Sequence, residues 1–304
     1  MTMTPEIAAF HTAQSVASDP GEMAGLYDGL PTDVRELARV VRGLTVHRVE
    51  ERLLDITHPV DRLHDDAETR YVDDILRLIV ARDDAPLVRR RAYADQFVGI
   101  CRDFALLHVS MLRHAGIPAR MRCGFADYWG MDGFHFDHVV TEYWDDTRGW
   151  LLADAQLGTA EFADRFPGVD FDPMDVPRDR FLVAGSAWQA IRAGTADPET
   201  FGLPFEDGSM VGEFFVMGSV RLDLSALNKV ETLQWDIWGG GPGPGEEPTE
   251  QDRELFDRVA LVTGGDQVAH EQARRLFAEH DALRTPPTVL SLTPFNGPRE
   301  VTLR

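Results

Sequence analysis

The chain has 304 residues, of which 43% are hydrophobic, so it can bury a core in one large or two ordinary domains, and general disorder is excluded. Its 51 acidic and 30 basic residues give a net charge of −21, which argues against nucleic acid or an anionic membrane as the main partner. The two cysteines, Cys101 and Cys123, exclude a disulfide scaffold and a four-cysteine zinc site but leave one disulfide open.

The first residues suggest no targeting signal. Residues 1–6 lack a basic region followed by an apolar run, and no apolar stretch of the sequence is long enough to cross a membrane. We therefore expect a cytoplasmic protein with no membrane partner.

The segment before residue 97 is predicted to be mostly helical. Residues 1–30 are weakly patterned, which indicates an irregular arm or short helices. Asp33 is a good helix cap, and the apolar spacing after it predicts a helix that ends at Gly43. The same periodicity predicts a second helix over 70–81 and a short third helix over 87–94.

A cysteine stands at the start of the next predicted helix. Apolar residues recur at helical spacing after Cys101: Phe104, Leu107, Met111 and Leu112. Gly116 and Pro118 predict that this helix ends near residue 114. The positive end of the helix dipole at Cys101 would stabilise a thiolate, which is the nucleophilic form of the side chain. A lone cysteine is also common in protein cores, so the residues downstream have to decide between the two interpretations.

Consecutive strands with short connections are predicted after this helix. The pattern indicates strands over 119–125, 136–144 and 150–155, a loop over 127–133 that contains Trp129, and a turn over 145–149. A helix followed by such strands predicts an α+β fold in which the nucleophile helix packs on an antiparallel sheet. Farther on, helices are predicted over 186–193 and 251–280, the second interrupted at 264–265, with a glycine-rich loop over 239–245.

A base and a residue that orients it are available for a thiolate at Cys101. His138 begins one predicted strand and Asp154 closes the next, so the two side chains can lie side by side. His135 is an alternative base three residues earlier. Asp145 and Asp146, in the turn, are alternatives to Asp154.

Three blocks of the chain resemble the transglutaminase-like superfamily. The blocks 99–105 (GICRDFA) and 112–120 (LRHAGIPAR) are similar to the signature around its cysteine, 138–143 to its histidine strand and 150–154 to its aspartate strand. The resemblance covers about residues 70–160. It implies a papain-like core with a Cys-His-Asp triad, whose roles fall on Cys101, His138 and Asp154.

The resemblance also implies a chemistry, which is acyl transfer through a thioester that hydrolyses or forms an amide bond. The expected substrate is a small-molecule or peptide amide, with an amine acceptor in the case of transfer. No cofactor or metal is expected, and no calcium-binding loop pattern is present in the sequence. On this basis we divide the chain into an N-terminal helical segment (1–69), a transglutaminase-like catalytic core (70–185) and a C-terminal extension (186–304).

Further candidates lie outside the triad. An oxyanion needs donors, and we expect the Cys101 N–H to be one and Gln96, just upstream, to be another, although Gln96 also fits a loop cap. The segment 227–238 mixes polar and aromatic residues and is either an ordinary packed segment or part of a substrate pocket. Its pocket candidates are Asn228, Lys229 and Trp235, to which Trp129 is added from the loop.

Two other classes of function compete with catalysis. The first is a non-catalytic transglutaminase-fold module that binds a partner or serves as a scaffold, although such a module has no reason to keep all three triad residues. The second is a metal protein that uses Cys123, His135 and His138, whose spacing matches no known zinc pattern.

Overall fold

A mixed β-sheet stands at the centre of the computed structural model, which describes residues 3–131, 133–204 and 210–304. The α-helices of these residues are α1 (Pro5–Thr12), α2 (Val34–Leu44), α3 (Glu51–Leu54), α4 (Val60–Asp65), α5 (Val72–Arg82), α6 (Cys101–His114), α7 (Ala160–Ala163), α8 (Ala184–Arg192), α9 (Glu213–Leu227), α10 (Glu250–Thr263) and α11 (His270–Glu279). Short 3₁₀ helices cover Gly21–Tyr27, Asp66–Glu68, Tyr93–Asp95, Ala155–Leu157 and Pro198–Thr200. The strands are β1 (Thr45–His47), β2 (Phe97–Gly99), β3 (Ala119–Ala126), β4 (His135–Asp145), β5 (Gly149–Ala153), β6 (Phe181–Val183), β7 (Phe201–Leu203), β8 (Met210–Val211), β9 (Asp236–Ile237), β10 (Thr288–Thr293) and β11 (Gly297–Thr302).

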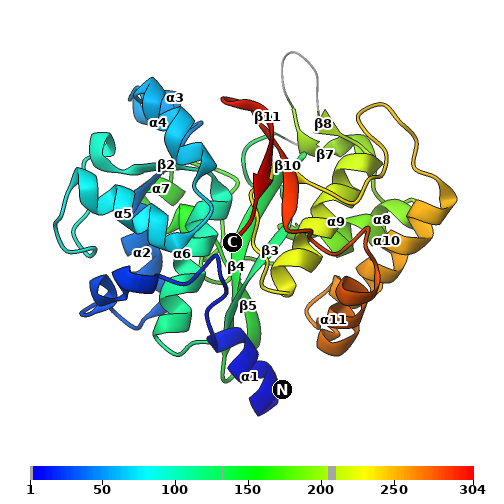
Figure 1. The fold of residues 1–304 in the computed structure, drawn as a ribbon, viewed down its shortest axis with the longest axis horizontal. Helices are drawn as coiled ribbons and strands as arrows, with labels where there is room; N and C mark the ends of the chain where they lie inside the picture. The colour runs from blue at the N-terminus through cyan, green and yellow to red at the C-terminus, as the bar shows by residue number, and fades with distance from the viewer. Residues whose placement is uncertain (1–2, 132, 205–209) are drawn as a thin grey trace.

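The fold is α+β, and its central strands run antiparallel. In the described residues the sheet has the order β6-β3-β4-β7-β8, and β5 pairs with β4 as well. Strands β3 and β5 pair antiparallel with β4, as the sequence predicts. Strand β6, which was not predicted, pairs antiparallel with β3, and β7 joins β4 in parallel. Helices α2, α5 and α6 lie on one side of this sheet and α8, α9 and α10 on the other (Figure 1).

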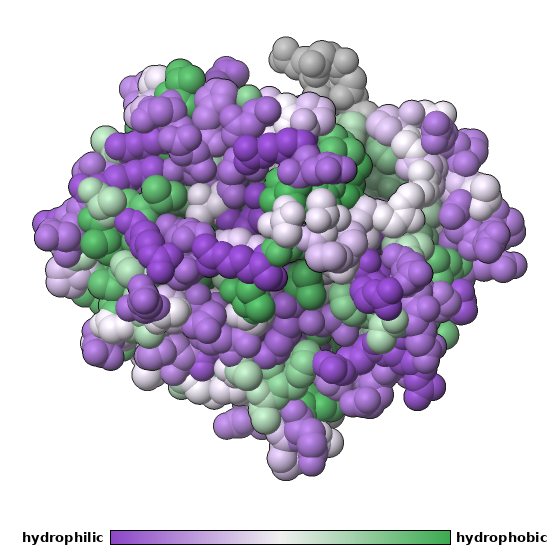
Figure 2. Space-filling model, viewed as in Figure 1, coloured by the Kyte–Doolittle hydropathy of each residue, from purple (hydrophilic) through white to green (hydrophobic). Residues whose placement is uncertain are grey.

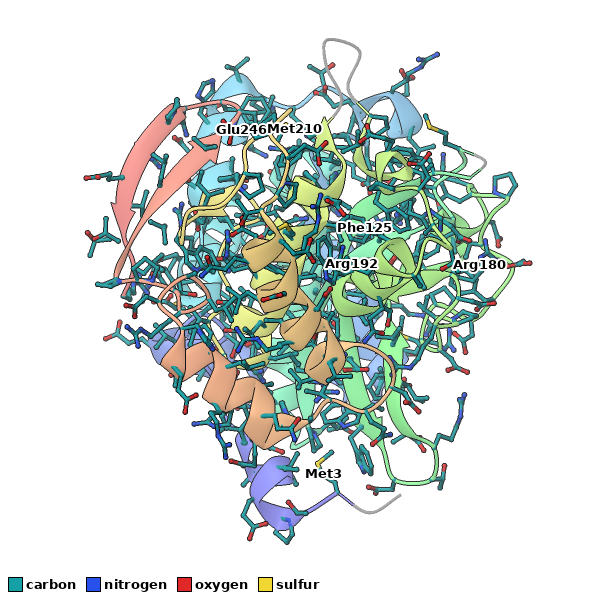
Figure 3. All side chains as sticks on the ribbon, turned by 90° about the vertical axis from the view of Figure 1, so that its right-hand side faces the viewer. Met3, Phe125, Arg180, Arg192, Met210 and Glu246 are labelled. Carbon is teal, nitrogen blue, oxygen red and sulfur yellow. The ribbon has the colours of Figure 1, made fainter. Side chains whose placement is uncertain are left out.

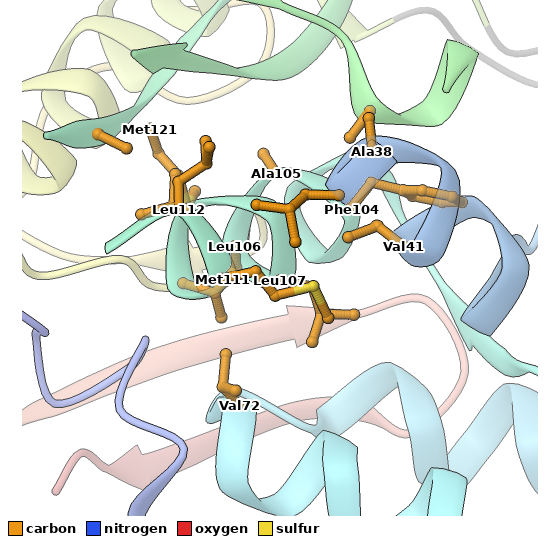
Figure 4. Packing of buried hydrophobic residues seen from close by; sticks show 14 of the residues in the cluster. Ala38, Val41, Val72, Phe104, Ala105, Leu106, Leu107, Met111, Leu112 and Met121 are labelled. Carbon is orange, nitrogen blue, oxygen red and sulfur yellow. The ribbon is translucent and has the colours of Figure 1, made fainter. Parts of the chain in front are cut away.

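Helix α6 is held in the main hydrophobic core, between the sheet and helices α2 and α5 (Figure 4). The side chains of Phe104, Leu106, Leu107, Met111 and Leu112 are at most 1% exposed. Burying each such side chain contributes about 1.5–3 kcal/mol, so the helix that begins at Cys101 is fixed firmly in place.

The opposite face of the sheet carries a second core. Phe125 of β3 packs there with Trp188 of α8 and Phe256 of α10, and Figure 3 looks onto this side of the molecule. A buried ion pair ties α9 to the same strand, because Arg122 donates to both oxygens of Asp223 at 3.0 Å. On the outside, hydrophilic residues cover most of the face in Figure 2, as expected for a chain of net charge −21.

Most predicted elements are confirmed, and one is wrong. Helix α2 begins where predicted, and the Asp33 side chain accepts hydrogen bonds from two backbone N–H groups of its first turn. The short helix predicted over 87–94 is absent, since only Tyr93–Asp95 form a 3₁₀ turn. In its place the Arg91 guanidinium donates to the carbonyl oxygens of Pro86 and Arg89, at 2.9 and 2.7 Å, and holds the segment as a loop. Asp132, in the predicted loop 127–133, lies outside the described residues.

Two small sheets were not predicted, and both lie close to Cys101. Strand β1 pairs in parallel with β2, and the register His47↔Gly99 brings the end of β1 next to the residues that precede α6. Strands β9, β10 and β11 form a three-stranded sheet in the described residues, and β9 lies directly after the residues Gln234 and Trp235. No helix in the described part of the chain is long and apolar enough to span a membrane.

Candidate active site

Cys101 is the first residue of α6 and is 6% exposed. The chain enters this helix from β2, and the Ile100 N–H donates to Asp103 Oδ2 at 2.9 Å, which caps the helix start. Gly99 fits closely here, because a Cβ on it would lie 2.9 Å from Asp103 Oδ2. The Cys101 N–H belongs to the first helical turn, whose N–H groups have no intrahelical acceptor, so it can donate to a bound group.

His138 lies beside the thiol, in the middle strand β4, and is 2% exposed. Its Nε2 is 2.8 Å from Asp154 Oδ2, and its side chain is also hydrogen-bonded to Cys101. Since Nε2 faces the carboxylate, Nδ1 is the nitrogen that faces the sulfur. Burial alone would lower the pKa of His138, but the Asp154 carboxylate and the contact with Cys101 outweigh it and raise the pKa above its ordinary value.

Asp154 follows β5 and is held by several hydrogen bonds. Its Oδ2 accepts from the Tyr128 hydroxyl at 2.9 Å as well as from His138, and its Oδ1 accepts from the Gln156 N–H at 2.9 Å. Its own N–H donates to the Pro173 carbonyl at 2.8 Å. The structure therefore brings Cys101, His138 and Asp154 together in one hydrogen-bonded chain, with Tyr128 as a further member.

The alternative triad residues lie elsewhere. The His135 ring stacks on Phe201 with 4.4 Å between ring centroids, at the edge where β4 meets β7. Asp145 accepts hydrogen bonds from the Thr147 and Arg148 N–H groups and so closes the β4–β5 turn. The structure gives neither of them a contact with Cys101.

Cys123 differs from Cys101 in its surroundings. It lies on β3 and is 4% exposed, and burial raises the pKa of its thiol, an effect that the nearby Asp223 carboxylate reinforces. Both cysteines are free thiols, so the disulfide that the sequence left open is not formed. Cys123, His135 and His138 do not combine into a metal-binding group, and residues 3–131, 133–204 and 210–304 contain no cluster of three such ligands.

The prediction that Gln96 donates to an oxyanion is not supported by its placement. Gln96 is fully buried, and its Nε2 donates to the carbonyl oxygens of Gly43 and Arg91 at 3.0 and 3.3 Å. Its amide hydrogens are thus used within the loop before β2, because that loop is folded over α2 rather than over Cys101.

A different glutamine, which the sequence did not single out, lies against the thiol. Gln234 Oε1 is 3.2 Å from Cys101 Sγ, and its Nε2 donates to Asp137. Burial raises the pKa of Asp137 to about 7. Because Gln234 is 133 residues from Cys101 in the chain, no local pattern could reveal this contact.

Comparison with known proteins relates part of the chain to a family. Residues 67–155 match the family model of the transglutaminase-like superfamily, and all three triad positions fall within the match. This region is transglutaminase-like. The region contains α6, which begins at Cys101, β4, which carries His138, and β5, which Asp154 directly follows.

A solved structure also matches part of the chain. A candidate cysteine protease from Cytophaga hutchinsonii is a structural neighbour with 15% sequence identity and a TM-score of 0.34. The match covers 54% of this chain and 46% of that chain, so it spans less than half the length of the neighbour. No curated protein matches the chain.

Two of the four pocket candidates, Trp129 and Trp235, lie near Cys101 and His138. The Trp129 ring meets the His138 ring edge to face at 5.2 Å, and the Trp235 ring lies 4.8 Å from the guanidinium of Arg48. Asn228 and Lys229 do not reach Cys101. Asn228 donates to the Leu224 carbonyl at the end of α9, and the Lys229 ammonium donates to the Ala13 carbonyl.

Buried arginines hold the segment 227–238 over the helix start. Arg102 of α6 donates to the Glu231 carbonyl at 2.5 Å, and Arg70 forms an ion pair with Asp236 at 2.7 Å. Charge-assisted hydrogen bonds of this kind are among the strong ones, so the segment that carries Gln234 and Trp235 is fixed in position.

Proposed function

We propose that this protein is a cysteine-dependent enzyme that transfers an acyl group through a thioester on Cys101, and so hydrolyses or forms an amide bond. The single observation that carries the proposal is the hydrogen-bonded chain from Cys101 through His138 to Asp154. The match of residues 67–155 to the transglutaminase-like superfamily supports it.

Each step follows from the protonation state of His138. With its pKa raised, the imidazole holds a proton beside the sulfur, which favours a thiolate–imidazolium pair. The Cys101 thiolate attacks the substrate carbonyl carbon and forms a C–S bond. The C–N bond then breaks, and the imidazolium gives its proton to the departing amine. Water or a second amine next attacks the thioester while His138 accepts its proton, the C–S bond breaks, and the thiolate is restored.

The oxyanion of each tetrahedral intermediate requires hydrogen-bond donors. We assign these to the Cys101 N–H and the side-chain amide of Gln234. The Gln234 amide oxygen faces the thiol and its nitrogen faces Asp137 in the structure, and a rotation by half a turn exchanges them. Since Asp137 holds a proton up to about pH 7, it can then donate to the amide oxygen while Nε2 donates toward the oxyanion. In our domain division, the extension 186–304 would thus complete a site whose triad lies within 70–185.

A screen of peptide amides with amine acceptors, read by mass spectrometry, tests the proposal. Wild-type protein should convert at least one amide to an acid or to a new amide. Cys101→Ala should convert none, whereas the matched variant Cys123→Ala should retain turnover, because the Cys123 thiol is not part of the chain that joins Cys101, His138 and Asp154. Turnover that survives in Cys101→Ala would refute the proposal. No turnover with any acyl donor would favour the non-catalytic binding module.

A further inference from the structure

Arg48 is a charged residue near Cys101 that the triad does not explain. It is partly buried, and its Nη1 is shielded from solvent without a hydrogen-bond partner. Several buried arginines face carboxylates: Arg42 pairs with Glu50, Arg70 with Asp236 and Arg122 with Asp223. Across the described ranges, Arg48 has no such ion pair. A desolvated guanidinium is costly unless an anion meets it, so the missing partner calls for an explanation.

The backbone fixes Arg48 beside the nucleophile. Arg48 directly follows β1, and its N–H donates to the Gly99 carbonyl at 2.9 Å. Gly99 lies two residues before Cys101, so the parallel pairing of β1 with β2 brings the arginine to the start of α6. Burial lowers the pKa of the Arg48 guanidinium, and the nearby Cys101 and Asp103 side chains oppose this shift.

Aromatic rings hold the Arg48 side chain in place without neutralising it. Its guanidinium carbon lies 4.8 Å from the ring centroid of Trp235 and 5.5 Å from that of Phe295. A guanidinium packed on aromatic rings keeps its N–H edge, which can form two parallel hydrogen bonds to a carboxylate. The chain has 51 acidic and 30 basic residues, so a shortage of carboxylates does not explain why Arg48 lacks an ion pair.

We propose that Arg48 binds a carboxylate of the acyl donor, close to the carbonyl that Cys101 attacks, so that the substrates are acidic amides or peptides with a free carboxylate near the reacting bond. This proposal rests on the proposed function, since it concerns the same thiol. It adds a substrate class and a residue that determines specificity.

Alkylation of Cys101 tests this without knowledge of the substrate. Two pairs of reagents differ only in a carboxylate: iodoacetate with iodoacetamide, and bromoacetyl-glycine with bromoacetyl-glycinamide. In each reaction the sulfur forms a C–S bond and halide leaves. The rate at Cys101 is measured by peptide mapping in the wild type and in Arg48→Met, Arg48→Lys and Arg275→Met. Arg275 is an exposed arginine of α11, so its variant matches the change in net charge away from the site.

The readout is the ratio of the rates with the acidic and the neutral reagent. For at least one pair, Arg48→Met should lower this ratio by about tenfold or more, since hydrogen bonds to charged groups are of that strength. Arg48→Lys should give an intermediate ratio, because it keeps the charge but loses the planar fork. Arg275→Met should leave the ratio unchanged.

The experiment distinguishes failure of the proposed role of Arg48 from failure of the proposed role of Cys101. Equal ratios in wild type and both Arg48 variants, for both reagent pairs, would overturn the role of Arg48 while leaving Cys101 as the nucleophile. Arg48→Lys keeps the positive charge, so it serves as the control for misfolding. If Arg48→Met does not fold, the ratio measured for Arg48→Lys decides whether Arg48 binds the carboxylate. If the neutral reagents modify Cys101 no faster than Cys123 in the wild type, the proposed nucleophile itself is refuted.

Discussion

Replacing Asp154 by asparagine should leave the fold intact but impair catalysis strongly. The carboxylate accepts three hydrogen bonds, from Tyr128 and His138 at Oδ2 and from the Gln156 N–H at Oδ1. An asparagine has one oxygen and one NH₂ group, so it cannot accept all three. Each of the two orientations of the amide has a specific cost.

If the oxygen stays opposite Gln156, the NH₂ group faces His138 Nε2. The imidazole then has to accept at Nε2 and carry its proton on Nδ1, toward Cys101, where it can no longer take a proton. A wrong tautomer of this kind lowers turnover by up to ~10⁴ in serine proteases. If the oxygen instead faces His138, the NH₂ group meets the Gln156 N–H, and a buried donor without an acceptor costs about 1–3 kcal/mol.

The assay measures turnover and thermal unfolding on the same sample of Asp154→Asn. We expect turnover of an amide found in the screen to fall by about 10³–10⁴, and the melting temperature to fall by only a few degrees, since about 1 kcal/mol corresponds to ~2–4 °C in a protein of this size class. Tyr128→Phe is the matched control, because it removes one hydrogen bond to Asp154 and leaves the His138 contact. A variant that melts early but turns over at the normal rate would show that Asp154 is structural.

Further predictions concern reactivity, pH dependence and the far side of the sheet. Iodoacetamide should modify Cys101 much faster than Cys123, whose thiol pKa is raised by burial; equal rates in peptide mapping would contradict this. Because the folded-state pKa of His138 is raised, its contribution to stability is fully present below about pH 6.5 and is lost as the pH rises through the folded-state value. The difference in unfolding free energy between wild type and His138→Gln, from urea denaturation, should therefore shrink as the pH rises, and a constant difference would exclude this linkage. Gln234→Leu should lower kcat by about 10²–10³ if its amide serves the oxyanion, and an unchanged kcat would remove it from that role. Asp223→Ala leaves the buried Arg122 guanidinium without its main partner and should cost about 3–5 kcal/mol in urea denaturation; a loss below about 1 kcal/mol would mean that the pair does not hold α9 to the sheet.

The sequence could predict those residues of the site that lie near one another in the chain and stand in recognisable local patterns. The cysteine at a helix start, the histidine strand and the aspartate after the next strand lie within 54 residues, and each has a local pattern. Helical periodicity after Cys101 predicts α6, and β-branched and aromatic content on either side of a short turn predicts β4 and β5. Neighbouring strands joined by a tight turn must pair, so His138 and Asp154 were expected to meet.

The remaining contacts depend on long-range packing that no local pattern encodes. Gln234 and Trp235 reach the site because the buried residues Arg70 and Arg102 bind a side chain and the backbone, respectively, of 227–238. Arg48 follows a three-residue strand whose partner is 52 residues away, too short for periodicity to detect. Gln96 failed as a prediction for the converse reason, since closeness in sequence to Cys101 did not decide where its amide points.

The most direct measurement is the detection of an acyl group on Cys101. Wild-type protein mixed rapidly with a p-nitrophenyl ester should release about one equivalent of p-nitrophenol in a burst, and mass spectrometry of the quenched sample should place the acyl group on the peptide that contains Cys101. Cys101→Ala should show neither burst nor adduct, and Asp154→Asn should form the adduct far more slowly. An adduct on another residue of the wild type, or an unchanged burst in Cys101→Ala, would contradict the account.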